Sequence, residues 1–178
     1  MRSIRPEPRR APPRGRGTVP FRPPGGCIFG ADLDPNTLHE LPIFEDLTPE
    51  ELALVSKVAF ERHYQEQATL FLEKMPGEVM YVIKTGHVDL SKRTPSGEDK
   101  TFVTLQAGEF FGEMSLIDEN PRSASATVRG GSELVVMSKK AFRELIAQHP
   151  AVAAKVLYNI LKVVNTRLRR MTELVKHV

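Results

Sequence analysis

The sequence predicts a mainly β domain with helices at both ends, and three observations support this fold class. Short apolar runs separated by turn residues occupy residues 59–138, at the roughly 8–12-residue intervals typical of a β-barrel, roll or sandwich. Apolar residues with helical spacing precede this region at 38–58 and follow it at 139–178. The 178 residues, of which 40% are apolar and 26% charged, suffice for one domain with extensions.

Residues 1–30 are predicted to form a disordered basic tail. The first 26 residues contain seven Pro, four Gly and seven Arg against a single Glu, and too few apolar side chains to offset the entropy of ordering. These 26 residues have a net charge of +6, whereas the whole chain has +3. The remaining residues therefore have a net charge of −3, which does not suggest nucleic-acid binding. A dispensable tail is favoured over a specific binding arm, because basic tails attract polyanions without specificity.

The composition also restricts location and chemistry. No stretch approaches the ~20 apolar residues that cross a bilayer, and no apolar region typical of a secretory signal follows the basic start. Cys27 is the only cysteine, so no internal disulfide forms and a cytoplasmic protein without membrane association is expected. The five His residues are scattered without metal-ligand spacing, and no nucleophile lies beside a base. We therefore expect no metal, no cofactor and no enzymatic activity.

The N-terminal helical segment, residues 38–58, contains a clear helix start. Thr48 is expected at the N-cap and Pro49 at the first helical position, where its missing N–H has no cost. Glu51, three residues after the cap, completes a capping box.

The region that follows consists of short strand-like runs divided by turn residues. Turns are expected at Pro76-Gly77, Gly86, 95–97, Gly108 and Gly130-Gly131. The main runs are 68–72, 79–83, 88–90, 101–105 and 134–137.

Two helices are expected after the strands, a short one at 139–148 and a long one at 150–178. Pro150 separates them, because a proline pushes the preceding residue out of the α region. Apolar residues on the long helix alternate at spacings of three and four, which is a heptad seam, and a second apolar stripe accompanies it. We predict that one stripe faces the β domain and the other a partner helix, giving a homodimer through 150–178; the alternative is a helix that only covers its own domain. The seam comprises Ala154, Leu157, Leu161, Val164, Leu168, Met171, Val175 and Val178, and the stripe Val152, Val156, Ile160 and Val163.

The chemistry is concentrated in residues 108–128. Gly112 breaks a strand and lets the backbone approach a ligand closely. A helical turn over 113–117 would offer unpaired N–H groups and a partial positive charge, which suit an anion. Arg122 follows after a turn, and its guanidinium can converge on the same anion with paired hydrogen bonds. Glu113 fits such a site if the ligand also carries a sugar hydroxyl that donates to its carboxylate.

The string Phe-Gly-Glu-Met-Ser-Leu followed by Pro-Arg-Ser-Ala, within residues 111–124, resembles the phosphate-binding cassette of the cyclic-nucleotide-binding domain family. That family includes the bacterial catabolite activator type and the regulatory subunits of cAMP-dependent kinase. The resemblance extends over 38–178, through the helical segment at 41–52 and the hairpin at 77–86. It implies a double-stranded β-helix, a jelly-roll-like β-roll, over residues 38–148.

The resemblance also implies roles for single residues. Glu113 would accept from the ribose 2′-hydroxyl, and Arg122 would pair with the cyclic phosphate. A threonine directly after the cassette arginine is associated with cGMP in this family. This chain has Ser123 there, which can contact phosphate or a guanine edge, and cAMP is favoured with cGMP as the alternative. The other residues expected around ribose and phosphate are Phe111, Gly112, Met114, Ser115 and Ala124.

In this family a residue of the long helix often closes over the base. The candidates are Thr166, Arg167 and Arg170. For the two arginines, a solvent-facing position beside Glu173 or other acids is favoured over a role as a lid.

The resulting prediction is a receptor for cAMP or cGMP in which ligand binding shifts the helices at 139–148 and 150–178, with Pro150 as the hinge. No helix-turn-helix follows the long helix in this sequence, so sequence-specific DNA binding is not expected and the downstream effector is unknown. The alternative is a structural or interaction module with a silent pocket. The presence of both Glu113 and Arg122 argues against that alternative.

Overall fold

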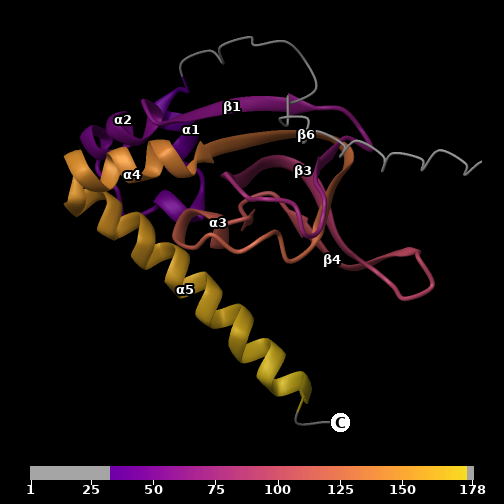
Figure 1. Cartoon of the computed structure of the whole chain (residues 1–178). Helices are drawn as coiled ribbons and strands as arrows, with labels where there is room; N and C mark the ends of the chain where they lie inside the picture. Colours follow the sequence, from indigo (N-terminus) through magenta and orange to yellow (C-terminus); the bar gives the residue numbers. More distant parts are fainter. Residues whose placement is uncertain (1–32, 176–178) are drawn as a thin grey trace, which may run out of the picture.

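The structure is a computed structural model that describes residues 33–175. The predicted tail, residues 1–30, and the last three residues of the predicted long helix lie outside the described residues. Within them, antiparallel strands form a β domain, and the short N-terminal helices and the start of the long C-terminal helix gather at one end of it (Figure 1), as the fold class predicts.

The N-terminal helical segment consists of three short helices within the described residues. Pro42 and Pro49 each occupy the beginning of a helix, because proline fits there and would interrupt a longer helix. The predicted capping box is confirmed: the Glu51 N–H donates to Thr48 Oγ1 at 3.4 Å, and the Thr48 N–H donates to Glu51 Oε2 at 2.9 Å. The helices are α1 (Pro35–His39), the 3-10 helix η1 (Pro42–Phe44) and α2 (Pro49–Ser56).

Within residues 33–175, six strands form one antiparallel sheet in the order β1-β6-β3-β4, with β2 against β6 and β5 against β3. The predicted runs correspond to β2, β3, β4 and β6, and β5 is the strand expected before Gly112, whereas β1 was not predicted. The strands are β1 (Ala59–Tyr64), β2 (Thr69–Phe71), β3 (Val79–Arg93), β4 (Asp99–Gln106), β5 (Phe110–Phe111) and β6 (Ser125–Ser138).

The prediction of turns at Gly86 and Gly130-Gly131 is wrong, because both lie inside long strands of 15 and 14 residues. Gly86 and Gly130 have φ angles of 88° and 74°, which only glycine adopts readily. The pairing of β3 with β6 shifts register between Ile83 and His87. Such bulges bend a strand without ending it, so the paired strands curve into a roll.

Successive residues of the central strands face two apolar cores. Met80 packs beneath the helices, whereas its neighbour Tyr81 faces the interior of the roll. Phe110 and Phe111 of β5 divide in the same way. Tyr81 and Phe111 stack inside the roll with ring centroids 5.1 Å apart. Phe111 thus belongs both to the interior core and to the segment 111–124.

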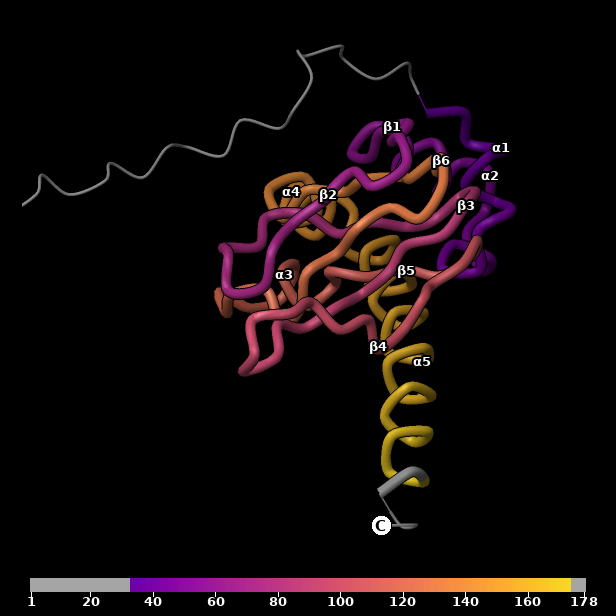
Figure 2. The backbone as a smooth tube through the Cα atoms, turned by 90° about the vertical axis from the view of Figure 1, so that its right-hand side faces the viewer, coloured from indigo at the N-terminus to yellow at the C-terminus, as the bar shows by residue number. Residues whose placement is uncertain are grey.

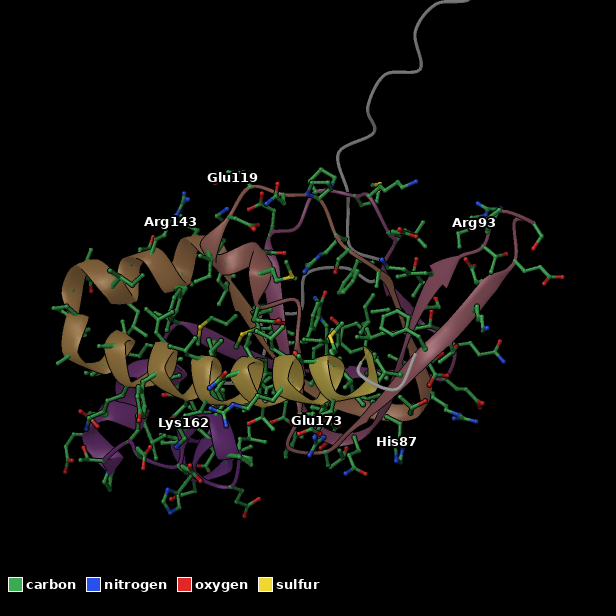
Figure 3. The ribbon with its side chains drawn as sticks, turned by 90° about the horizontal axis from the view of Figure 1, so that it is seen from below. His87, Arg93, Glu119, Arg143, Lys162 and Glu173 are labelled. Atoms are coloured by element: carbon green, nitrogen blue, oxygen red, sulfur yellow. The ribbon has the colours of Figure 1, made fainter. Side chains whose placement is uncertain are left out.

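The C-terminal helices are α4 (Lys139–Gln148), with the predicted bounds, and α5 (Pro150–Val175). The first half of α5 is fixed to the N-terminal helices: Asn159 Nδ2 donates to the Ile43 carbonyl at 3.0 Å, and Lys162, which is labelled in Figure 3, pairs with Glu45 at 3.1 Å. The last turns of α5 extend beyond the roll (Figure 2). None of the helices in residues 33–175 combines the length and apolar character that a membrane span requires.

The two apolar stripes of α5 differ in exposure. Val152, Val156 and Ile160 of the second stripe are buried, and Val163 packs partly against the same core. Leu157 and Val164 of the seam are also partly buried against the domain. The remaining large seam residues with described side chains are exposed, namely Leu161 (63%), Leu168 (60%) and Met171 (64%). The homodimer remains a prediction.

Candidate functional site

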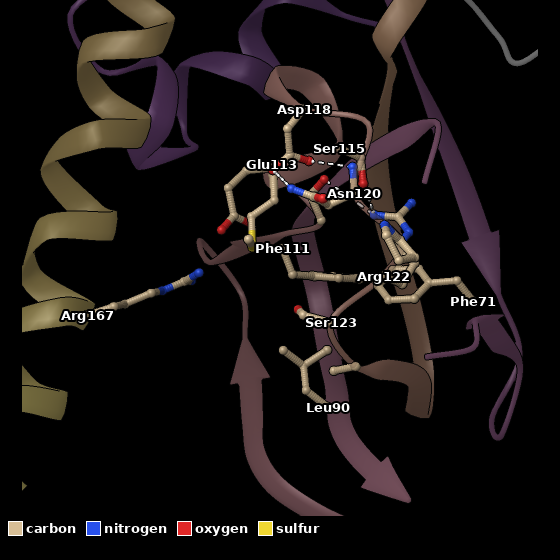
Figure 4. A pocket seen from close by; sticks show the side chains of 14 residues that line it. Phe71, Leu90, Phe111, Glu113, Ser115, Asp118, Asn120, Arg122, Ser123 and Arg167 are labelled. Carbon is tan, nitrogen blue, oxygen red and sulfur yellow. Dashed lines mark hydrogen bonds between the residues drawn. The ribbon is translucent and has the colours of Figure 1, made fainter. Parts of the chain in front are cut away.

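A cavity of about 110 Å³ lies at the segment that carries the predicted chemistry. Phe71 of β2, Leu90 of β3 and Arg167 of α5 complete its lining (Figure 4). All eight residues predicted to surround ribose and phosphate line it: Phe111, Gly112, Glu113, Met114, Ser115, Arg122, Ser123 and Ala124.

One short helix, α3 (Met114–Ile117), forms part of the lining, and Glu113 precedes it. The helix ends at Ile117, the last residue of the helical turn predicted over 113–117. The reason is that the Asp118 carboxylate accepts from the Asn120 backbone N–H at 3.1 Å and so forms a turn. The following strand, β6, starts at Ser125.

Gly112 makes the close packing at the cavity possible. Its φ of 76° lies in the left-handed region. A Cβ at this position would lie 2.6 Å from Arg122 Nη1 and 3.0 Å from the Val79 carbonyl oxygen. A side chain here would therefore displace the Arg122 guanidinium.

Arg122 is buried, with 6% of its surface exposed. Nη1 donates to Ser115 Oγ at 2.8 Å, and to the Gly112 carbonyl at 3.4 Å. Nη2 donates to the Val79 carbonyl at 2.7 Å. The guanidinium also lies 4.0 Å from the centroid of the Phe71 ring. All of these contacts are with neutral groups.

This arginine has no counter-ion within the described residues. No carboxylate oxygen in residues 33–173 lies within ion-pair distance of it, and its buried Nε has no hydrogen-bond partner there. Burial lowers the pKa of Arg122, while the charges of Glu113 and Glu78 act in the opposite direction. Because a buried cation is costly without a partner, the arrangement suits an anionic ligand.

Acidic and amide groups line the cavity as well. Glu113 is partly buried, and Asp118 and Asn120 lie beside it in the lining (Figure 4). Across the part of the chain that the structure describes, no three His, Cys, Asp or Glu side chains are grouped to hold a metal ion. Ionised carboxylates can accept hydrogen bonds from hydroxyl groups of a ligand.

Of the three candidates on the long helix, the structure brings only Arg167 to the cavity. Its Nη2 donates to the Phe110 carbonyl at 2.8 Å and lies 3.7 Å from Glu109 Oε1. Arg167 is therefore partly buried against the roll and lies beside another acid, Glu109, as the favoured interpretation allowed, and it also lines the cavity. Thr166 and Arg170 are exposed and are not part of the lining.

Sequence reasoning missed five lining residues. Phe71 and Leu90 come from different strands, and both pair with Ala126 of β6, so only the strand register could have revealed them. The other three belong to the turn after α3, which the sequence indicated as a turn but not as part of the site: Asp118, Asn120 and Pro121.

Comparison with known proteins matches residues 61–149 to the model of the cyclic nucleotide-binding domain. The chain is 34% identical over 128 residues to the cyclic AMP receptor protein of Thermus thermophilus, covering 72% of this chain and 57% of the relative. It is 31% identical to a CRP-like cAMP-activated global transcriptional regulator of Mycobacterium tuberculosis, covering 72% and 55%. The chain thus spans little more than half the length of these relatives, whose names are those of binding and regulatory proteins.

Solved structures show the same architecture. A cyclic nucleotide-binding domain from Methylobacillus flagellatus superimposes with a TM-score of 0.70 at 28% identity, covering 79% of each chain. The Thermus thermophilus catabolite activator protein gives a TM-score of 0.66 at 32% identity, covering 76% of this chain and 62% of the other. The antiparallel roll with flanking helices and a long C-terminal helix is therefore shared with these proteins.

Proposed function

The chain belongs to the cyclic nucleotide-binding domain family, and from this premise we propose that it is a receptor for a cyclic nucleotide, cAMP rather than cGMP. One observation carries the proposal: the buried Arg122 guanidinium lines the cavity without a counter-ion among the described residues. The negatively charged cyclic phosphate would supply that partner through charge-assisted hydrogen bonds.

The remaining lining groups suit the rest of such a ligand. The start of α3 and the Ser115 hydroxyl would lie near the phosphate with Arg122, and the Glu113 carboxylate would accept from the ribose 2′-hydroxyl. The preference for cAMP rests on Ser123, because threonine at this position is associated with cGMP in the family, and on the cAMP-related names of the bacterial relatives.

The size of the cavity supports a conformational response. Its volume of about 110 Å³ is well below the ~300–1,000 Å³ of typical small-molecule sites. A nucleotide would therefore have to move a part of the lining, and among the described residues Arg167 is the only lining residue that comes from α5. Pro150 begins α5, and the preceding His149 has non-helical dihedral angles, so this junction is the proposed hinge. Binding would shift the populations of two arrangements of α4 and α5, and an unidentified protein effector would read them.

Calorimetric titration of the full chain with cAMP, cGMP and 5′-AMP tests this function. We expect one cAMP per chain and weaker binding of cGMP. Binding of 5′-AMP should be at least about tenfold weaker than that of cAMP, since its open phosphate has a different charge and shape. Absence of binding for both cyclic nucleotides would instead support the silent structural module.

A further inference from the structure

Lys139, the first residue of α4, is a buried cation outside the cavity. Its side chain is only 4% exposed, and lysine is almost never buried to this degree unless it is paired. Nζ donates to the Asp118 carbonyl at 2.5 Å and to Glu119 Oε1 at 2.7 Å. Both acceptors belong to the turn that follows α3.

This turn has two sides with different contacts. Asp118 and Asn120 line the cavity, whereas the residue between them, Glu119, contacts α4. Arg143, one helical turn after Lys139, also reaches Glu119 Oε1, at 3.1 Å (Figure 3). One wall of the cavity is therefore bound directly to the first two turns of α4.

The main chain of Lys139 contacts a second part of the site. Its N–H donates to the Glu78 carbonyl at 2.8 Å. The next carbonyl along the chain, that of Val79, accepts from Arg122 Nη2 at 2.7 Å. Lys139 thus touches both the turn that lines the cavity and the segment that holds the cavity's cation.

We propose that Lys139 is a positioning residue that couples occupation of the cavity to the position of α4. The proposal rests on the proposed function, since it assigns to that site a route toward the C-terminal helices. A ligand that repositions residues 113–122 displaces the two acceptors of Lys139. The ammonium group follows them, because separation would leave a buried charge unpaired, and α4 moves with it against α5.

Arg143 provides a matched comparison. It binds the same carboxylate oxygen from the same helix, but its side chain is 62% exposed. An exposed ion pair of this kind contributes little to stability, because water can replace either partner. The coupling should therefore depend on Lys139 and not on Arg143.

Hydrogen exchange of the full chain with and without cAMP tests the coupling in the wild type, Lys139→Met and Arg143→Met. In the wild type and Arg143→Met, we expect cAMP to slow exchange in both 111–124 and 139–148. Lys139→Met should still bind cAMP, within about tenfold of the wild-type affinity, and protect 111–124, but lose the cAMP-dependent protection of 139–148. The same protection of 139–148 in Lys139→Met as in the wild type would overturn the proposal.

Exchange without nucleotide separates this proposal from the receptor function. In Lys139→Met, exchange in 116–122 should accelerate by about fivefold or more, while Arg143→Met leaves it unchanged. That result is independent of whether any nucleotide binds, so a failed titration would contradict the receptor function alone. If Lys139→Met does not fold, Glu119→Gln removes the ionic partner from an exposed position. It should reduce the cAMP-dependent protection of 139–148, and full retention would equally overturn the proposal.

Discussion

Neutral groups hold the Arg122 guanidinium in place. A serine hydroxyl, two carbonyl oxygens and an aromatic ring surround it, and the absence of a side chain at Gly112 leaves the room that it needs. Gly77 also packs against this group, since a Cβ there would lie 2.0 Å from Ser115 Oγ and 3.0 Å from Arg122 Nε. At the residue scale, the affinity for an anion therefore depends on small residues as much as on the cation.

Substitution of Gly112 by alanine should weaken cAMP binding by at least about tenfold, because the new Cβ would collide with Arg122 and the left-handed backbone would be strained. Gly130→Ala is the matched control. Its φ of 74° imposes the same strain, but no atom lies within 4 Å of a Cβ there. Calorimetry should show near wild-type affinity for Gly130→Ala only; equal affinities in both variants would contradict this role.

The sequence predicted mainly those site residues that lie close together in one segment of the chain. Residues 111–124 carry their chemistry in one segment, so the pattern indicates the anion site directly. Phe71 and Leu90 reach the same cavity through strand pairing, which composition does not reveal. Helical periodicity likewise could not distinguish Arg167 from Arg170, since the choice depends on how α5 lies relative to the roll.

At the scale of elements, Glu51 joins two helices. Its carboxylate accepts from the Thr48 N–H at 2.9 Å, which caps α2, and from Lys155 Nζ at 2.7 Å, which holds α5. The capping box is local and was predicted from the sequence. The contact with Lys155 spans 104 positions, so no local pattern could reveal it.

This shared carboxylate predicts a pH dependence of stability. The hydrogen bond from Lys155, and then that from the Thr48 backbone, lower the pKa of Glu51 from its ordinary value of 4.5. Ionised Glu51 therefore contributes stability above that value, and the contribution is lost as pH falls through the lower pKa of the folded state. Urea unfolding should show a smaller loss of unfolding free energy between about pH 7 and pH 3.5 in Glu51→Gln and in Lys155→Met than in the wild type. An unchanged loss in Lys155→Met would contradict the contact between the two helices.

The long strands show where element prediction fails. Glycines at 86, 130 and 131 predict turns that would end a strand. In the structure, β3 and β6 continue through these glycines and bend there. A bulge and a turn use the same residue type, and only the paired strand decides between them.

At the scale of the whole molecule, the β class and both flanking helical regions were predictable from periodicity. Their assembly was not, because the position of α5 depends on contacts such as Asn159 with Ile43. The exposed part of the α5 seam supports the proposed homodimer, since large apolar side chains repeat along one face beyond the roll.

Sedimentation velocity of the full chain should therefore show a dimer, and Leu168→Glu should weaken it by at least about tenfold, because a carboxylate would be buried in an apolar seam. Thr166→Glu is the control. Residues two positions apart on a helix lie on nearly opposite sides of it. Thr166 is exposed and lies two positions before Leu168, so it faces away from the seam. A monomeric wild type, or equal dimerisation of Leu168→Glu, would refute the interface.

The most direct test of the central claim is the cAMP affinity of Arg122 variants, measured by calorimetry on the full chain. Truncating one partner of a buried charge pair typically costs ~2–5 kcal/mol, so Arg122→Ala should bind at least about tenfold more weakly than the wild type. Arg122→Lys keeps the charge without the paired geometry and should also lose affinity. Circular dichroism verifies that each variant is folded. A folded Arg122→Ala protein with wild-type affinity for cAMP would contradict the account.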